Sequence, residues 1–383
     1  MFRKWLLVSI VLLGACSIAR FAVLRAAPVQ EFAQSSFQFA LPGYKFSFPK
    51  DHGAHPAYQT EWWYYTGHLT ADDGSKFGYE LTFFRYALTD KKPLGRSSWA
   101  VRDVDFAHFA ITDQTHQKYF FCDRMERANM GLAGAQKAKE NFLPRIWIDN
   151  WQLQFQGKNG NSQHIQARGI AQNSDNQTRM MINLSQRALT PPIINGENGV
   201  SRKGPETGQA SHYYSMPRLA TSGTLKLGNK QYKVTGESWL DREFSSKGLA
   251  KNQVGWDWFA IQLDDGRNLM LYQIRQKNNK IDPHSAGTLS GKNTNTVHLK
   301  QNDFQIKVLD WWTSPHTKAR YPAKWKVDIP RYHLSLIVTP TVADQEMRPR
   351  RESAIYWEGS CAVSGSSAGK AYVEMTGYTP LRY

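Results

Sequence analysis

The chain has 383 residues, of which 41% are hydrophobic and 21% charged, and its net charge is +16. This length predicts two domains or one large all-β unit. The basic residues are dispersed and no DNA- or RNA-binding motif is visible, so nucleic acid is excluded as the expected partner, whereas anionic lipid head groups suit a basic chain.

The first residues have the pattern of a secretory signal. Positive charges at residues 3–4 precede an apolar run over 5–15, which is too short to span a bilayer comfortably. The run ends in Leu-Gly-Ala before Cys16, which resembles a bacterial lipobox, where the signal is cleaved before the Cys and the thiol is lipidated. We therefore expect residues 1–15 to be a lipoprotein-type signal peptide and residues 16–36 to be a tether.

Two alternatives to lipidation stay open at this point. The segment is either an uncleaved signal anchor with an incidental Cys16, or it is cleaved after a later residue such as Ala27. Ser17 follows the Cys, and resemblance to Gram-negative lipoproteins then implies the outer membrane, facing the periplasm. The expected partner is thus a membrane, reached through the lipidated N-terminus.

After the tether the sequence has the pattern of an all-β protein. Apolar and polar residues alternate in short segments bounded by Gly, Asp and Asn. The predicted strands are 62–70, 77–86, 147–155, 164–172 and 180–185. Asp-Asp-Gly within 71–74 predicts a hairpin turn, because Asp-Gly supplies the positive φ of tight hairpins. The stretch 130–140 is a candidate helix.

The middle of the chain contains a long loop and then an echo of an earlier hairpin. Residues 188–209 are rich in Pro, Gly and Asn, which predicts a lid or an interdomain connection. Residues 256–275 resemble 62–85, since both have an aromatic strand, an Asp-Asp-Gly turn and a strand ending in Arg. We expect two similar β domains in tandem, over 37–217 and 218–383.

Two cysteines remain beyond the signal region. Cys122 and Cys361 are compatible with one disulfide in an oxidising compartment or with two buried free thiols. No CxxC or Cys/His cluster indicates zinc.

Two tripeptides are the strongest candidates for chemistry. In an extended chain residues i and i+2 point to the same face, so His212 lies beside Tyr214, and Trp239 beside Asp241. If both segments border one cavity, it contains an acid, an imidazole, a phenol and an indole. The alternative is an aromatic core with a structural His–Asp hydrogen bond, or an Asp241 that is ionised and paired with Arg218 or Arg242.

Several motifs resemble one family. Glu-Trp-Trp-Tyr at 61–64, HYYSMPRL at 212–219, ESWLDREF at 237–244 and Tyr-Trp-Glu-Gly at 356–359 are similar to the hydroxyneurosporene synthase family, which includes carotenoid 1,2-hydratases and AttH-type secreted proteins. The resemblance spans roughly 50–383 and implies two lipocalin-like β-barrel domains. It also implies catalysis at 212–214 and 239–241, although Tyr214 and Trp239 exchange the aromatic types of the hydratases.

The resemblance implies hydration of an alkene without a cofactor. We expect Asp241 to be the proton donor, because a carboxyl in a dry pocket has a raised pKa. Trp239 and Tyr214 would stabilise the carbocation through their ring faces, and His212 would position water and accept its proton.

A second set of residues is expected to bind the ligand. It comprises Glu61, Trp62, Trp63, Tyr64, Trp256, Asp257 and Trp258. For the two carboxylates the alternative is pairing with Arg at a barrel end. His52 and His55 have HxxH spacing in a loop but no third ligand, so we expect no metal. No nucleophile elbow, HExxH or phosphate-binding loop is present.

Three functions follow from these patterns. The first is an enzyme that hydrates or isomerises a hydrophobic, isoprenoid or lipid-like substrate by acid catalysis. The second is a lipocalin-like carrier without turnover. The third is an accessory factor of an envelope transport complex.

Overall fold

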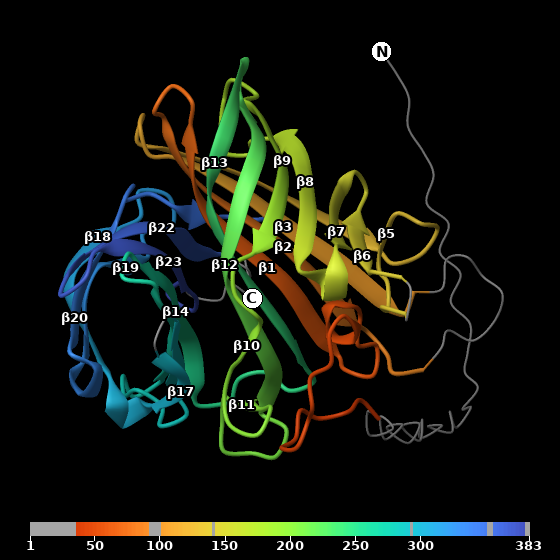
Figure 1. Cartoon of the computed structure of the whole chain (residues 1–383), viewed down its shortest axis with the longest axis vertical. Coiled ribbons are helices and arrows are strands. Elements are labelled where there is room, and N and C mark those ends of the chain that lie inside the picture. The colour runs from red at the N-terminus through yellow and green to blue at the C-terminus, as the bar shows by residue number, and fades with distance from the viewer. Residues whose placement is uncertain (1–35, 92–100, 140–141, 292–293, 351–354, 380–383) are drawn as a thin grey trace, which may run out of the picture. The chain divides into compact units, whose positions relative to one another are not determined.

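The computed structural model describes residues 36–91, 101–139, 142–291, 294–350 and 355–379, and Cys16 with the predicted signal and tether lies outside them, apart from residue 36. The described chain is almost entirely β-strand, and its only helices are short 3-10 turns at Lys50–His52, Lys158–Gly160, Gln301–Asp303 and Pro330–Tyr332. Two curled, barrel-like sheets result (Figure 1), which confirms the predicted all-β fold with two lipocalin-like β-barrel domains. No helix within this part of the chain is long and apolar enough to cross a bilayer.

The first sheet has 13 strands in the order β4-β3-β2-β1-β13-β12-β9-β8-β7-β6-β5, with β10 and β11 added beside β12. Their bounds are β1 Thr60–Ala71, β2 Lys76–Ala87, β3 Asp103–Asp113, β4 Lys118–Arg127, β5 Ala133–Ala135, β6 Arg145–Ile148, β7 Trp151–Gln156, β8 Ser162–Ile170, β9 Arg179–Ala188, β10 Ile193–Ile194, β11 Ser201–Arg202, β12 Ala210–Leu227 and β13 Lys230–Ser245.

The second sheet has 10 strands in the order β17-β16-β15-β14-β23-β22-β20-β19-β18, with β21 beside β22. Their bounds are β14 Gln253–Leu263, β15 Arg267–Gln276, β16 Ala286–Gly291, β17 Thr294–Lys300, β18 Gln305–Thr313, β19 Arg320–Ile329, β20 Leu334–Pro340, β21 Glu346–Met347, β22 Tyr356–Gly365 and β23 Gly369–Met375. Figure 1 shows this sheet curling into a ring.

The two similar hairpins have the same local cause. β1 pairs with β2, and β14 with β15, each in antiparallel register around an Asp-Gly turn. Gly74 and Gly266 in these turns have φ of 84° and 90°, a region that L residues with a Cβ avoid. The echo in the sequence is therefore a repeated hairpin, and each copy supplies a central strand to its sheet.

Four expectations differ from the structure. Residues 147–155 form two strands, because Asp149 turns the chain with φ of 52°. Residues 130–140 contain β5, whose pairing with β6 outweighs helix propensity. Residues 188–209 carry β10 and β11, which fasten this segment to β12. The boundary at 217/218 falls inside β12, and the chain passes between sheets only after Ser245.

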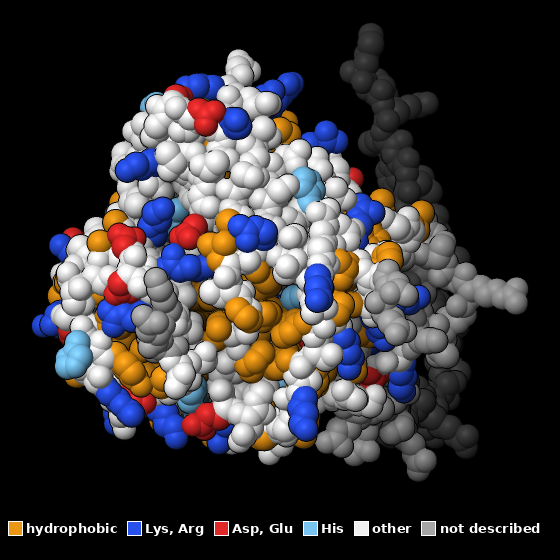
Figure 2. All heavy atoms as spheres, viewed as in Figure 1, with side chains coloured by type: hydrophobic (Ala, Val, Ile, Leu, Met, Phe, Trp, Pro, Cys, Tyr) orange, Lys and Arg blue, Asp and Glu red, His pale blue; other side chains and the backbone are white. Residues whose placement is uncertain are grey.

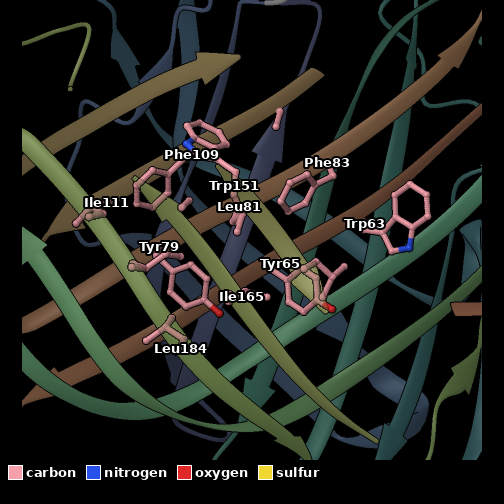
Figure 3. Packing of buried hydrophobic residues seen from close by; sticks show 14 of the residues in the cluster. Trp63, Tyr65, Tyr79, Leu81, Phe83, Phe109, Ile111, Trp151, Ile165 and Leu184 are labelled. Carbon is pink, nitrogen blue, oxygen red and sulfur yellow. The ribbon is translucent and has the colours of Figure 1, made fainter. Parts of the chain in front are cut away.

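Each sheet encloses its own aromatic core. In the first, Trp63, Tyr65, Tyr79, Phe109 and Trp151 are fully buried on the concave side (Figure 3). Trp325 and Trp357 are buried in the corresponding core of the second sheet. Burying a large apolar side chain contributes about 1.5–3 kcal/mol. The cores thus account for many of the aromatic residues in the sequence, but not for those on the outer faces.

The outer faces of the two sheets meet along a seam. His108 Nδ1 lies 2.6 Å from the Tyr356 hydroxyl, and Thr112 donates to Gln345 at 2.7 Å. His68 approaches the carbonyl of Ala371 at 3.1 Å. A separate cluster at the seam contains Tyr64, Tyr213, Trp239, Trp258 and Tyr372. β1, β12 and β13 are therefore buried on both faces.

Both cysteines are buried free thiols, Cys122 in β4 and Cys361 in β22. The sequence left open either one disulfide or two free thiols, and the structure has two free thiols.

On the surface, Lys and Arg side chains are scattered over the face drawn in Figure 2, with hydrophobic side chains gathered near its centre.

Candidate functional site

A cavity of about 350 Å³ lies between the two sheets. β1, β2, β12 and β13 form one wall, and β14, β15, β22 and β23 form the other. Its lining is mainly aromatic and carboxyl: Trp62, Tyr64, Phe84, Trp256, Trp258, Tyr272, Tyr356, Asp241, Glu243, Glu358 and Glu374. Apolar walls with a few converging polar groups are typical of small-molecule sites, and this volume is at the lower end of the usual range of about 300–1,000 Å³.

Strand alternation decides which residues reach the cavity. Even-numbered residues of β1 point to the seam and odd-numbered ones to the core, so Trp62 and Tyr64 line the cavity while Trp63 does not. On β13 the odd-numbered residues take the seam side. The register places Asp241 opposite Tyr64 on β1 and Ser215 on β12. Asp241 therefore lies in the middle of the first wall.

Asp241 is held by three hydrogen-bond donors. Its Oδ1 accepts from Trp239 Nε1 at 2.7 Å and from the Ser215 hydroxyl at 2.5 Å. Its Oδ2 accepts from the Tyr213 hydroxyl at 2.5 Å, and Trp258 Nε1 donates to that hydroxyl at 3.1 Å. No ion pair among the described residues includes Asp241, since Arg218 pairs with Glu237 and Arg242 with Glu61.

These contacts fix where a proton on Asp241 resides. An indole nitrogen can only donate a hydrogen bond, so Trp258 donates to the Tyr213 oxygen. The Tyr213 hydroxyl must therefore donate its own hydrogen bond to Asp241. Oδ1 already accepts two bonds, which leaves the second lone pair of Oδ2 for a proton. Burial raises the pKa of Asp241 to about 7 although the three donors oppose this shift. Asp241 is thus able to exist in either protonation state near neutrality.

Glu243 is the second carboxyl of this wall. It lies two residues beyond Asp241 on the same face of β13, which corresponds to roughly 7 Å along a strand. Ser211 donates to Glu243, and Lys203 Nζ lies 3.8 Å from its Oε2. Burial raises the pKa of Glu243, whereas Lys203 lowers it. Asp241, which has only neutral donors, and Glu243, which has Lys203 nearby, are therefore neighbours on one face of β13.

The opposite wall has two further carboxyls. Glu358 of β22 and Glu374 of β23 are direct cross-strand neighbours. Burial raises the pKa of Glu374 to about 7 and that of Glu358 well above its ordinary value, and each carboxylate disfavours ionisation of its neighbours, which include Glu80 of β2. Acidic groups face the cavity from both sheets.

The structure brings only part of the predicted catalytic set together. Trp239 and Asp241 lie at the seam, but His212 and Tyr214 point to the other face of β12. His212 Nδ1 lies 2.7 Å from the carbonyl oxygen of Gly199, and its ring stacks on Tyr44 at 4.1 Å. The Tyr214 hydroxyl lies 2.6 Å from His52 Nδ1. Neither residue lines the cavity.

The predicted ligand-binding residues divide in the same way. Trp62, Tyr64, Trp256 and Trp258 line the cavity. Asp257 faces away from it and binds Arg275 at 3.2 Å and the Tyr378 hydroxyl at 3.0 Å.

Glu61 and Trp63 belong to a buried ionic network on the core side of β1. Glu61 is fully buried and pairs with Arg85 and Arg242. The Arg242 guanidinium lies 3.9 Å over the Trp63 ring. These residues hold the strand rather than contact the cavity.

The two histidines of the HxxH pattern, His52 and His55, interact with different groups. His52 stacks on Phe155 at 4.4 Å, and burial lowers its pKa to about 4. His55 lies near Asp51 and Glu61. Within the described residues no group of His, Cys, Asp or Glu has the arrangement of a metal site.

Sequence reasoning missed five polar residues of the site: Tyr213, Ser215, Glu243, Glu358 and Glu374. The signal for Glu243 was present, because it is at i+2 from Asp241 just as Trp239 is at i−2. For Tyr213 the sequence gives no signal of its own, because the i, i+2 pattern points to its neighbours His212 and Tyr214. Glu358 lies in a motif quoted for the family, but nothing local indicates that its strand crosses to Asp241.

Comparison with known proteins agrees with this architecture. The AttH-like family model matches residues 39–378. The crystal structure of an AttH protein from Nitrosomonas europaea matches with a TM-score of 0.78 and 31% identity, covering 90% of this chain and 100% of that chain. Kievitone hydratase from Nectria haematococca has a TM-score of 0.61 at 14% identity, covering 90% of this chain and 99% of that chain, which is a likeness of fold alone.

One curated relative is similar in sequence. Dehydratase asqC from Emericella nidulans is 24% identical in an alignment 192 positions long, which covers 45% of this chain and 52% of that protein. The match therefore spans about half the length of this relative. The family match covers most of the chain and confirms the AttH-type resemblance found in the motifs, so this chain belongs to the AttH-like family.

Proposed function

We propose that the protein is a cofactor-independent hydratase or dehydratase, which adds water to a double bond of a small hydrophobic molecule or removes it. The observation that carries the proposal is Asp241, a buried carboxyl without an ion pair, held by three donors in an aromatic cavity. The names of two similar proteins, a hydratase and a dehydratase, agree with this chemistry.

Asp241 is the acid in the forward direction. The proton on Oδ2 passes to one alkene carbon, the π electrons form the new C–H bond, and the positive charge remains on the neighbouring carbon. The resulting carboxylate keeps its three hydrogen bonds, which compensate the charge that it gains. A pKa of about 7 suits a group that must donate a proton and then take it back near neutral pH.

The aromatic lining stabilises the cation. The rings of Trp62, Tyr64 and Trp258 line the cavity, and a desolvated cation–π contact to such a ring contributes about 2 kcal/mol. These residues take the place that the sequence assigned to Tyr214, while Trp239 acts through its hydrogen bond to Asp241.

Glu243 is the base in place of His212. A water molecule attacks the cation, its oxygen forms the new C–O bond, and the proton that it releases passes to the ionised Glu243. After product release, Glu243 gives this proton to solvent water and Asp241 takes one from it, which restores both groups. The positions of Asp241 and Glu243 on one strand leave room for substrate and water between them. Dehydration is the same sequence in reverse.

The cavity limits the size of the reacting part. A volume of about 350 Å³ encloses the end of a substrate, so a long polyene would extend beyond it. We therefore infer that a compact molecule or the terminus of a longer one reacts here.

A panel of small alkenes and tertiary alcohols tests the reaction. The protein is incubated in water labelled with oxygen-18, and products are analysed by mass spectrometry for the label. Asp241→Asn should lose about 10²–10⁴-fold in turnover, the usual contribution of a general acid. His212→Gln is the matched control and should stay within about threefold. Unchanged turnover in Asp241→Asn, or loss in the His212 variant alone, would contradict the assignment.

A carrier without turnover is the second candidate, and the largely aromatic lining favours it. In that case a hydrophobic ligand co-purifies, and Asp241→Asn retains it unchanged.

We also propose the lipid anchor at Cys16, which would hold the cavity beside a membrane where hydrophobic molecules partition.

A further inference from the structure

Three carboxyl groups of the cavity lack a basic partner. Asp241, Glu358 and Glu374 line it, and no ion pair among the described residues includes them, whereas Glu243 has Lys203 at 3.8 Å. The groups beside Glu358 are the hydroxyls of Tyr64 and Tyr356, and the indole of Trp256 lies beside Glu374, so these two carboxyls have only neutral donors next to them. Buried carboxylates are costly unless a positive group compensates them.

The cavity already holds one ammonium group. Lys203 Nζ lies 3.8 Å from the centroid of the Tyr272 ring and 5.1 Å from that of Tyr213. Both distances are typical of cation–π contacts, which strengthen when the cation is desolvated. Trp62 and Trp258 also line the cavity, and no cation–π contact among the described residues involves either ring.

We propose that this cavity binds hydrophobic organic cations, namely ammonium ions with a small apolar body, between the rings of Trp62 and Trp258 and the paired carboxyls of Glu358 and Glu374. The proposal goes beyond hydration because it concerns binding and requires no turnover. The ligand's charge compensates carboxyls that the protein leaves unpaired, and its body displaces water from aromatic surface.

Ionisation of the cavity sets the pH dependence. The titratable groups that line it are Asp241 and Glu243 on β13, Glu358 and Tyr356 on β22, Glu374 on β23, Tyr64 on β1, Tyr272 on β15, and Lys203 and Lys247 from the loops. Behind them, Tyr213 of β12 donates to Asp241, and Glu80 of β2 acts on Glu358. A carboxyl is negative above its pKa, and the pKa values of Asp241 and Glu374 are raised to about 7. A permanently charged ligand should therefore bind more tightly at pH 8 than at pH 5.

Two isosteric probes isolate the charge. Benzyltrimethylammonium and neopentylbenzene have the same shape, and only the first is charged. Their dissociation constants for the purified full-length chain are measured by tryptophan fluorescence at pH 5 and pH 8. We expect the cation to bind at least tenfold more tightly than the neutral probe at pH 8, and the ratio to fall at pH 5.

Variants of opposite sign make the test specific. Glu358→Gln and Glu374→Gln should weaken cation binding severalfold and leave the neutral probe unchanged, whereas Lys203→Gln should strengthen it. Asp175→Asn, on an exposed turn, is the control for an ordinary lost carboxylate. Equal affinity for both probes at pH 8, no binding of either, or a preference that survives both Glu variants would overturn the proposal. Turnover of Asp241→Asn tests hydration and the dissociation constants of the two probes test cation binding, so either proposal can fail without the other.

Discussion

The ionic network behind β1 allows a quantitative test of what holds the cavity wall. Glu61 bridges Arg85 and Arg242, and Glu61→Gln keeps the shape but removes the charge. Arg85 retains Asp103 at 2.7 Å. Arg242 retains only neutral partners, the carbonyl oxygens of Gly53 at 2.7 Å, Glu243 at 2.8 Å and Trp62 at 3.4 Å, and the His55 ring. Because Arg242 is fully buried, the variant leaves an uncompensated charge, which costs about 3–5 kcal/mol.

Urea unfolding at pH 7, followed by the fluorescence of the chain's tryptophans, measures this loss. The double variant Glu61→Gln with Arg242→Met should recover most of the lost free energy of unfolding, since the buried charge that remains, Arg85, still has Asp103 as its partner. Asp175→Asn should change it by less than about 0.5 kcal/mol. A loss below about 1 kcal/mol in Glu61→Gln, or a double variant less stable than either single one, would refute this reasoning.

The same network predicts a pH dependence. Arg242 and Arg85 hold the pKa of Glu61 well below its ordinary value against the effect of burial. A lowered pKa means that the stabilisation is present above about pH 4, the ordinary range of glutamate, and is lost as the pH falls further. The difference in unfolding free energy between the protein and Glu61→Gln should shrink below that pH.

Further predictions concern single groups. Burial raises the pKa of Asp241 to about 7, so its contribution to stability is lost as the pH rises from about 4 to 7, and Asp241→Asn should flatten that part of the stability profile in thermal melts. Trp239→Phe removes one donor to the carboxylate and should raise the pKa of Asp241 further, which carbon-13 NMR of the labelled carboxyl would detect, and an unchanged pKa would contradict the role of the indole. Cys122 and Cys361 should react with a thiol reagent only after unfolding, and reductant should leave the melting temperature unchanged. Cys16→Ser should abolish incorporation of labelled fatty acid and release the protein from the membrane fraction, whereas retained label would remove the anchor proposal.

Local sequence was sufficient for the strands and for the family. Alternating side chains and Asp-Gly turns predict hairpins because these features act over a few residues, and both repeated hairpins follow from them. The motifs that carry the family resemblance are likewise continuous segments. Where local preference competes with pairing, as at 130–140 with β5, the partner strand decides and the sequence alone misleads.

The faces of the central strands were decided by tertiary structure. Period-two alternation implies that His212 and Tyr214 share one face and Trp239 and Asp241 another, but not which face meets a cavity. Polarity gives no answer, because β1, β12 and β13 are buried on both sides, one by the barrel core and one by the second sheet. Only the packing of the sheets turns Asp241 toward Glu374, which lies far away in the sequence. The sequence by itself therefore determined the fold and the family, whereas the packing of the two sheets at the seam decided which of the predicted site residues face the cavity.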